Sequence, residues 1–196
     1  MRSHRHRAAA LVAVAALLGG CSETTPGTAS AGPAPRTSAS GSAPTTSTTP
    51  STTRPKKVDL AGVDSCSLLS DAQKQQFDLV KSPATLKSSV YADATLCSIN
   101  SGDFSYGVGL VAAAKNGIGE YASGVEKGEL TPMTVGGFPA LTGKSTTLLP
   151  SCVVYLDVAD GQMIDLGVDS TKVPMDELCV RAGKIAGAII QTISAR

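Results

Sequence analysis

Cysteine offers more kinds of chemistry than any other residue type in this chain, and the 196 residues include five cysteines. Cys21 lies near the N-terminus, and the other four are Cys66, Cys97, Cys152 and Cys179. A thiolate metal site needs cysteine pairs at short spacing, and none of these four is close to another. An even number of cysteines in an exported domain is typical of disulfides, so two disulfides are expected if the chain is exported.

Histidine is confined to the extreme N-terminus, at His4 and His6. If that segment is removed, no Ser-His or Cys-His dyad and no His-bearing catalytic zinc site can form. The chain has no Ser-x-x-Lys, HExxH, Walker or Cys-x-x-Cys motif. Gly107-Val108-Gly109 imitates a dinucleotide fingerprint, but these glycines fall inside a predicted strand rather than between a strand and a helix. We therefore predict no catalytic residue, no cofactor and no metal.

Carboxylates are the remaining acid and base groups, and Asp157, Asp160 and Asp165 surround one predicted hairpin. A facing pair would suit glycoside hydrolysis, and three together would suit Ca²⁺. The simpler interpretation, which we favour, is a solvated turn in which Asp160 is present because Asp-Gly forms tight turns.

The N-terminal segment resembles a lipoprotein export signal. Arg2, Arg5 and Arg7 precede the uncharged stretch 8–20, which is too short for a membrane span of about 20 residues but suits a signal peptide. The stretch ends in Leu18-Gly19-Gly20-Cys21, which resembles a bacterial lipobox. The resemblance implies cleavage before Cys21 and lipid attachment to its sulfur. The alternative is ordinary cleavage that leaves Cys21 as a free thiol.

Composition divides the chain into three parts, namely a signal peptide (1–20), a lipidated cysteine with a disordered linker (21–57) and a globular domain (58–196). The linker is rich in Ser, Thr and Pro and has few large apolar residues, so it cannot offset the entropy of ordering. The domain has ten Lys and Arg against fifteen Asp and Glu, a formal charge of −5. This charge argues against nucleic-acid binding, which needs a basic face.

Periodicity in the domain predicts helices and strands in the order α-β-β-α-β-β-β-β-α. Ser70 and Gln73 form a capping box, which predicts a helix at Asp71–Phe77. Pro174 suits the first turn of the last helix, whose apolar stripe is Leu178, Ala182, Ile185, Ala186, Ile189 and Ile193. A weaker helix is predicted at Gly117–Lys127. The predicted strands are Ala94–Asn100, Phe104–Ala113, Thr131–Val135, Ala140–Thr146, Cys152–Val158 and Gln162–Val168.

Short turns between successive strands favour an antiparallel sheet. The predicted fold class is therefore α+β, with an antiparallel β-sheet packed by N- and C-terminal helices and two disulfides. Three pairings of the four cysteines exist. We favour Cys66–Cys97 and Cys152–Cys179, because each joins a terminal helical region to a nearby strand.

The domain resembles domain-of-unknown-function family 3558, a family of actinobacterial lipoproteins. Asp64-Ser65-Cys66-Ser67-Leu68-Leu69-Ser70 is similar to the opening of that family, "DPCSLLT". Cys97, the turn Gly137-Phe138-Pro139-Ala140, Cys152 and Cys179 follow in the family's order. The resemblance implies a location and an architecture, and no activity.

These observations predict a lipid-anchored protein on the outer face of the cytoplasmic membrane. We expect a non-enzymatic binding or accessory module of the cell envelope, with an envelope protein or an apolar ligand as its partner. The alternative is a carboxylate-dependent hydrolase of cell-wall polymers, which needs a cleft with two facing carboxylates. An exposed apolar patch is the feature that would favour the binding module.

Overall fold

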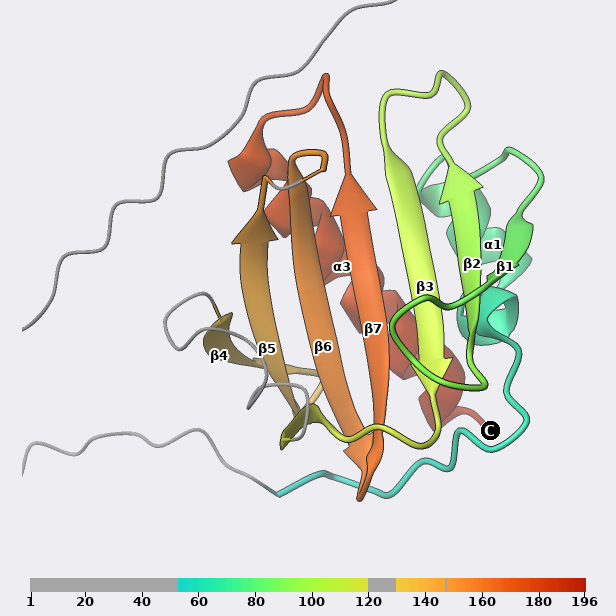
Figure 1. Cartoon of the computed structure of the whole chain (residues 1–196), viewed down its shortest axis with the longest axis vertical. Helices are drawn as coiled ribbons and strands as arrows, with labels where there is room; N and C mark the ends of the chain where they lie inside the picture. Colours follow the sequence, from blue (N-terminus) through green and yellow to red (C-terminus); the bar gives the residue numbers. More distant parts are fainter. Residues whose placement is uncertain (1–52, 120–129, 147) are drawn as a thin grey trace, which may run out of the picture. The chain divides into compact units, whose positions relative to one another are not determined.

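A seven-stranded antiparallel sheet with helices on one face forms the folded part of the chain (Figure 1). The computed structural model describes residues 53–119, 130–146 and 148–196. All of them belong to one contact unit, Thr46–Arg196. Residues 1–52, with Cys21, and most of the predicted helix at Gly117–Lys127 lie outside the described residues.

The first half of the domain forms one side of the sheet. A 3₁₀ turn, η1 (Ser65–Leu68), and a short helix, α1 (Asp71–Gln76), precede three strands, β1 (Ala84–Lys87), β2 (Thr95–Asn100) and β3 (Gly107–Ala113). The capping box at α1 is confirmed, because the Ser70 side chain accepts from the Gln73 N–H and the Gln73 side chain accepts from the Ser70 N–H. Neither η1 nor β1 was predicted from the sequence.

The second half forms a meander and the last helix. The four strands are β4 (Leu130–Val135), β5 (Phe138–Ser145), β6 (Ser151–Ala159) and β7 (Gln162–Asp169), and the helix is α3 (Met175–Ser194). The sheet order is β1-β2-β3-β7-β6-β5-β4, so β3 and β7 join the two halves at the centre. The predicted α+β architecture is confirmed.

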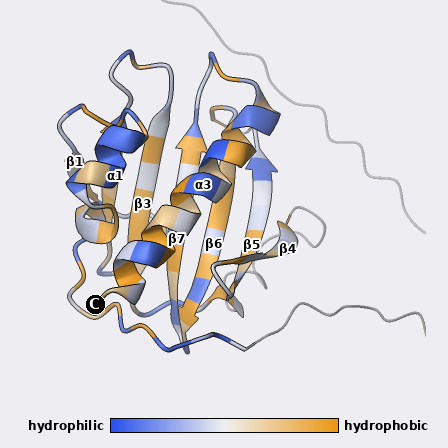
Figure 2. Cartoon of the chain, turned by 180° about the vertical axis from the view of Figure 1, so that it is seen from behind, coloured by the Kyte–Doolittle hydropathy of each residue, from blue (hydrophilic) through white to orange (hydrophobic). Residues whose placement is uncertain are grey.

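Helix α3 packs across β6 and β7, and α1 lies beside it on the same face of the sheet (Figure 2). All six residues of the predicted stripe are buried. They contact alternate strand residues such as Leu110, Leu156 and Leu166 in one apolar core. Within the described part of the chain, no helix combines the length and the hydrophobicity needed to cross a membrane.

Two turns differ from the sequence prediction. We expected a strand from Phe104, but Phe104 has a φ of 55° and is 60% exposed, so it belongs to the turn before β3. We expected four turn residues between β4 and β5, but Gly136 and Gly137 suffice. Their φ angles of 56° and 85° match a two-residue hairpin turn, so Phe138 and Pro139 already pair with β4.

Both favoured disulfides are present. Cys66 of η1 is bonded to Cys97 of β2, and Cys152 of β6 is bonded to Cys179 of α3. Each disulfide therefore ties a helical segment to the strand beneath it. Figure 1 shows the chain entering near the end of the sheet where β6 finishes, and the Val58 N–H donates there to the Val158 carbonyl at 3.0 Å.

Candidate functional site

The face of the sheet turned away from α3, called here the open face, carries the candidate site. Cross-strand neighbours in a sheet share a face, so the registers of β2, β3, β7, β6 and β5 define rows of side chains across it. The row at one end of the sheet, called the polar row, consists of Asn100, Gly107, Asp169, Ser151 and Ser145. The next row, called the glycine row, consists of Ser98, Gly109, Gly167, Val153 and Gly143.

A third row of larger side chains closes the glycine row on the other side. It consists of Leu96, Val111, Asp165, Tyr155 and Leu141. Glycine leaves the sheet surface bare, and a Cβ added to Gly167 would have no atom within 4 Å. At Gly167 the glycine row therefore forms a trough between the side chains of the two neighbouring rows, and Leu96 Cδ1 borders it at Gly109, 3.2 Å from the position of an added Cβ.

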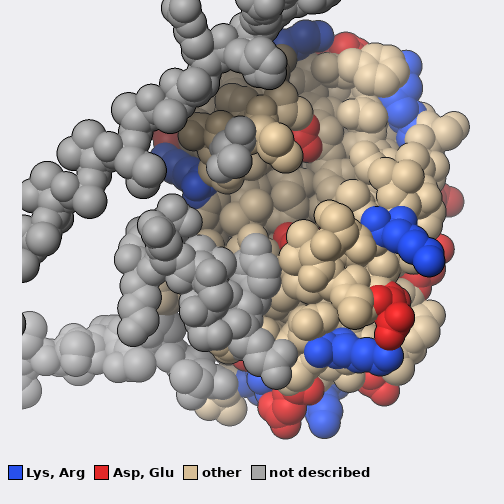
Figure 3. Space-filling model, viewed as in Figure 1, with Lys and Arg blue, Asp and Glu red and all other residues tan. Residues whose placement is uncertain are grey.

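Two leucines from the β5–β6 connection border this trough. Leu148 is 94% exposed and Leu149 is 45% exposed. With the trough they form a hollow of about 360 Å³, visible on the face shown in Figure 3. The residues that line the hollow are Gly109, Ser145, Leu148, Leu149, Ser151, Val153, Gly167 and Asp169. Its lining is mainly apolar, with polar groups at the end of the sheet, as is common in ligand sites.

Another part of the open face is covered. The loop between β1 and β2 crosses in front of β3 (Figure 1), and its Tyr91 packs with Val111, Tyr155 and Met163 in a second apolar cluster. The Tyr91 hydroxyl donates to Asp165 at 2.9 Å. Because burial outweighs this hydrogen bond, the pKa of Asp165 is raised to about 6. Among the described residues, the hollow thus lies beside this covered part of the open face.

Asp169 is the charged group in the hollow. It lies across from Gly107 in β3, and Gly107 lies across from Asn100 in β2. Both Asp169 carboxylate oxygens and the Asn100 Oδ1 lie within 3.3 Å of the position that a Cβ on Gly107 would occupy. The missing side chain of Gly107 therefore leaves room for three acceptor oxygens around that position.

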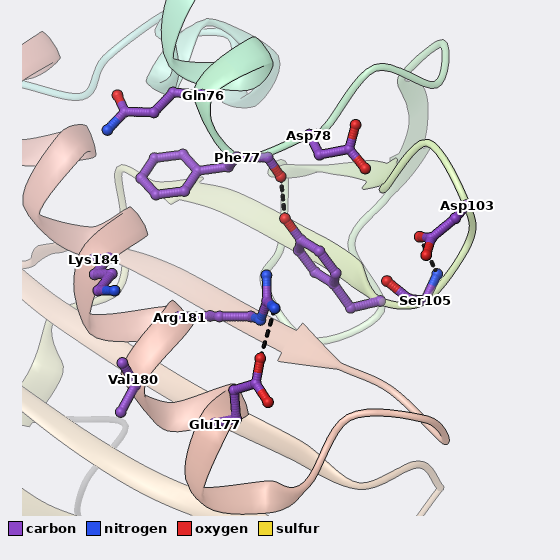
Figure 4. A pocket seen from close by; sticks show the side chains of 10 residues that line it. Gln76, Phe77, Asp78, Asp103, Ser105, Glu177, Val180, Arg181 and Lys184 are labelled. Atoms are coloured by element: carbon purple, nitrogen blue, oxygen red, sulfur yellow. Dashed lines mark hydrogen bonds and ion pairs between the residues drawn. The ribbon is translucent and has the colours of Figure 1, made fainter.

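A second, more polar groove of about 510 Å³ lies between α1, α3 and the turn before β3 (Figure 4). Arg181 lies over the Tyr106 ring, 4.7 Å from its centroid, and pairs with Glu177 at 2.6 Å. The groove is lined by Gln76, Phe77, Asp78, Asp103, Ser105, Tyr106, Glu177, Val180, Arg181 and Lys184.

The carboxylates of this groove accept hydrogen bonds or ion pairs from nearby donors. Asp103 accepts from Ser105 and from Ser101, which lowers its pKa to about 2. Asp78 accepts from the Gly102 N–H at 3.0 Å, and Glu177 is paired with Arg181. General acid catalysis near neutral pH needs a carboxyl group with a raised pKa, so this arrangement does not favour acid catalysis by Asp103.

The three hairpin carboxylates singled out in the sequence do not form one site. Our prediction of a solvated turn holds for Asp160, which is 84% exposed, but is wrong for the other two. The Asp157 side chain is 12% exposed and pairs with Arg54 at 2.8 Å. Arg54 also contacts Asp160 at 2.7 Å, whereas Asp165 lies on the open face beneath Tyr91. The chain thus contacts the domain from Arg54, before the expected boundary at residue 58.

Sequence reasoning missed Asp169, Asn100 and the glycine row. Gly107 and Gly109 are two residues apart and so share one strand face, and Asp165, Gly167 and Asp169 alternate in the same way. This repeated alternation was the available signal, because glycines on one strand face mark a bare patch.

The comparisons with known proteins agree with the resemblance. Neither the curated proteins nor the solved structures contain a match to this chain. A family model described as "Protein of unknown function (DUF3558)" matches residues 16–192, which is most of the sequence. The chain therefore belongs to the DUF3558 family.

Proposed function

We propose that this protein is a lipid-anchored module on the outer face of the cytoplasmic membrane, and that its domain binds a small apolar ligand in the hollow without catalysing a reaction. The lipobox-like sequence before Cys21 supports the anchor. Two disulfides support an oxidising, extracytoplasmic location, because cytosolic proteins seldom keep them.

The observation that carries the binding function is the exposure of Leu148 and Leu149 beside a bare trough. Exposed leucines next to a concave apolar surface favour a ligand that removes both from water. The cell-wall hydrolase is the less supported alternative, because the carboxylates of the polar groove are engaged by local donors.

The position of the hollow suits a tethered receptor. Residues 54–58 attach where β6 ends, through Arg54 to Asp157 and Val58 to Val158. The hollow lies where β6 begins, at Ser151. Six residues separate Ser151 from Asp157, which corresponds to about 20 Å along a strand. The hollow therefore lies near the opposite end of β6 from the point where residues 54–58 attach.

Titration with a neutral apolar fluorophore tests the binding function. The non-lipidated chain 22–196 keeps every described residue and both disulfides, so it suits fluorescence with N-phenyl-1-naphthylamine. We expect saturable binding with one site per chain. Gly167→Val should abolish it, because the new side chain enters open space in the hollow and valine is well tolerated in strands.

Leu86→Ser is the matched control, since Leu86 is 55% exposed on β1, outside the hollow. It should leave the fluorophore affinity unchanged. Binding that is non-saturable, or equal in the Gly167→Val chain, would argue against the hollow as a ligand site.

Metabolic labelling with a fatty acid tests the anchor separately. The wild-type chain should incorporate the label and stay with the membrane fraction, whereas Cys21→Ala should accumulate as unprocessed precursor without label. A normally processed Cys21→Ala chain that remains on the membrane would contradict the lipobox assignment.

A further inference from the structure

Three acceptor oxygens lie together at the end of the hollow. Asn100 Oδ1 and both Asp169 oxygens converge over Gly107. Within the described residues, neither a lysine nor an arginine lies within ion-pair distance of Asp169, and no hydrogen bond to its carboxylate is found. Asp169 is half-buried, and this burial raises its pKa.

Several other carboxylates of the domain have a partner within the chain. Arg54 pairs with Asp157, Lys115 with Asp93, and Lys144 with Asp176. Even Asp165, on the same face, accepts from the Tyr91 hydroxyl. Asp169 thus stands out among the described carboxylates as a half-buried acid to which no described residue donates.

We propose that the ligand of the hollow carries a primary ammonium group on an apolar chain, with the ammonium against Asp169 and Asn100 and the chain over the glycine row toward Leu149. The proposal deepens the proposed function and rests on it. An ammonium has three N–H donors, which match the three converging acceptor oxygens, and it needs no acceptor in return. Charge complementarity with an unpaired, half-buried carboxylate favours a cation over a neutral or anionic head.

The side chains beside the polar row indicate the shape of the apolar part of the ligand. Next to the polar row, Gly109 and Gly167 lie directly opposite each other. The space over Gly167 is open, and Leu96 Cδ1 borders the floor at Gly109. Val153 adjoins this floor, and Leu148 and Leu149 rise beside it. An unbranched alkyl chain fits this arrangement because it can lie flat on the floor while the leucines cover it.

Three eight-carbon probes that differ only in the head group test the proposal. Octylammonium, octanol and octanoate are used to displace N-phenyl-1-naphthylamine from chain 22–196. We expect octylammonium to bind about tenfold more tightly than octanol, the size of effect that close charge pairs give in shielded sites. Octanoate should bind more weakly than octanol, because its carboxylate would approach Asp169.

Asp169→Asn should remove the preference for octylammonium over octanol. The matched control is Asp71→Asn, which changes the net charge equally at a side chain that is 93% exposed on α1. The control should keep the full preference. The head-group comparison in the wild-type chain needs no variant, so equal affinities there would overturn the ammonium proposal even if Asp169→Asn folds poorly.

The outcomes separate the two proposals. If neither the fluorophore nor any octyl probe binds, the proposed function fails, and the ligand class falls with it. If all three probes bind with equal affinity, the apolar site stands and the ammonium proposal is overturned. An ammonium preference that persists in Asp169→Asn also overturns it, because the attraction would then come from the acidic domain as a whole.

Discussion

The Tyr91 hydroxyl donates a hydrogen bond to the Asp165 carboxylate at 2.9 Å, across the open face of the sheet. Tyr91 comes from the loop between β1 and β2, and Asp165 from the central strand β7. The pair therefore fastens the covering loop to the sheet and sets the border between the covered part of the open face and the hollow.

The first prediction concerns pH and Asp165. Its pKa is about 6 in the folded chain against 3.8 for an ordinary aspartate, so between these values the folded state holds a proton that the unfolded state has lost. The contribution of Asp165 to stability is complete below about pH 4 and is lost as pH rises through about 6. A shift of about two units corresponds to roughly 2–3 kcal/mol.

Asp165→Asn should remove this dependence and keep an acceptor for Tyr91. We expect the variant to be about 2 kcal/mol more stable than wild type at pH 7.5 and equal to it near pH 4. Urea unfolding of both chains across this pH range measures the difference in their free energies of unfolding. Both chains contain Asp169, so its titration does not contribute to that difference. A stability difference that does not change with pH would contradict the assignment.

The second prediction concerns the contact between Arg54 and Asp157. Removing the guanidinium leaves a carboxylate that is 12% exposed without its cation. Arg54→Ala should therefore lower the free energy of unfolding by about 1–3 kcal/mol. Lys115→Ala breaks an ion pair whose side chains are 71% and 73% exposed, and should cost less than about 0.5 kcal/mol. Equal effects in urea unfolding would show that burial does not strengthen the Arg54 contact.

The third prediction compares the two disulfides. They close loops of similar length, with sequence separations of 31 and 27 residues. Removing either pair by alanine substitution should cost about 3–4 kcal/mol, because the unfolded chain gains a similar freedom. Hydrogen exchange should distinguish them. Amides of α3 should exchange faster after loss of Cys152–Cys179 than after loss of Cys66–Cys97, and the reverse pattern would refute the local role of each bond.

The fourth prediction concerns the turn between β4 and β5. Gly136 has a φ of 56°, and a Cβ there would lie 2.7 Å from Ile190 Cγ2 in α3. Gly136→Ala should thus cost more than about 2 kcal/mol, since backbone strain and a clash add. Gly62→Ala is the control, because Gly62 has a φ of 70° but open space around it, and it should cost about 1 kcal/mol.

Adding Ile190→Ala to the Gly136→Ala chain should recover part of the loss, because the clash partner is shortened. Thermal unfolding of the single and double variants measures the coupling between the two positions. Strictly additive effects would mean that the backbone angle alone accounts for the cost at Gly136.

Local features of this protein were determined by the sequence. The capping box at Ser70 and Gln73, the tight turn at Asp160-Gly161 and the stripe from Leu178 to Ile193 depend on residues within a few positions of each other, so their patterns predict structure directly. The cysteine pairing was also predicted correctly, because each pair joins segments of modest separation. Phe104 was wrongly predicted to lie in a strand, because apolar and polar residues alternate from Phe104 onward. Its positive φ places it in the turn before β3.

The candidate site was decided by the tertiary structure. Asn100, Gly107 and Asp169 meet only because β3 pairs with β7 in one particular register, and that register joins strands from opposite halves of the domain. A shift of one residue would turn Asp169 and Gly167 toward the core, so burial of Leu166 and Val168 fixes the register. Pairing between distant strands is set by the fit of the whole core, which no local pattern contains.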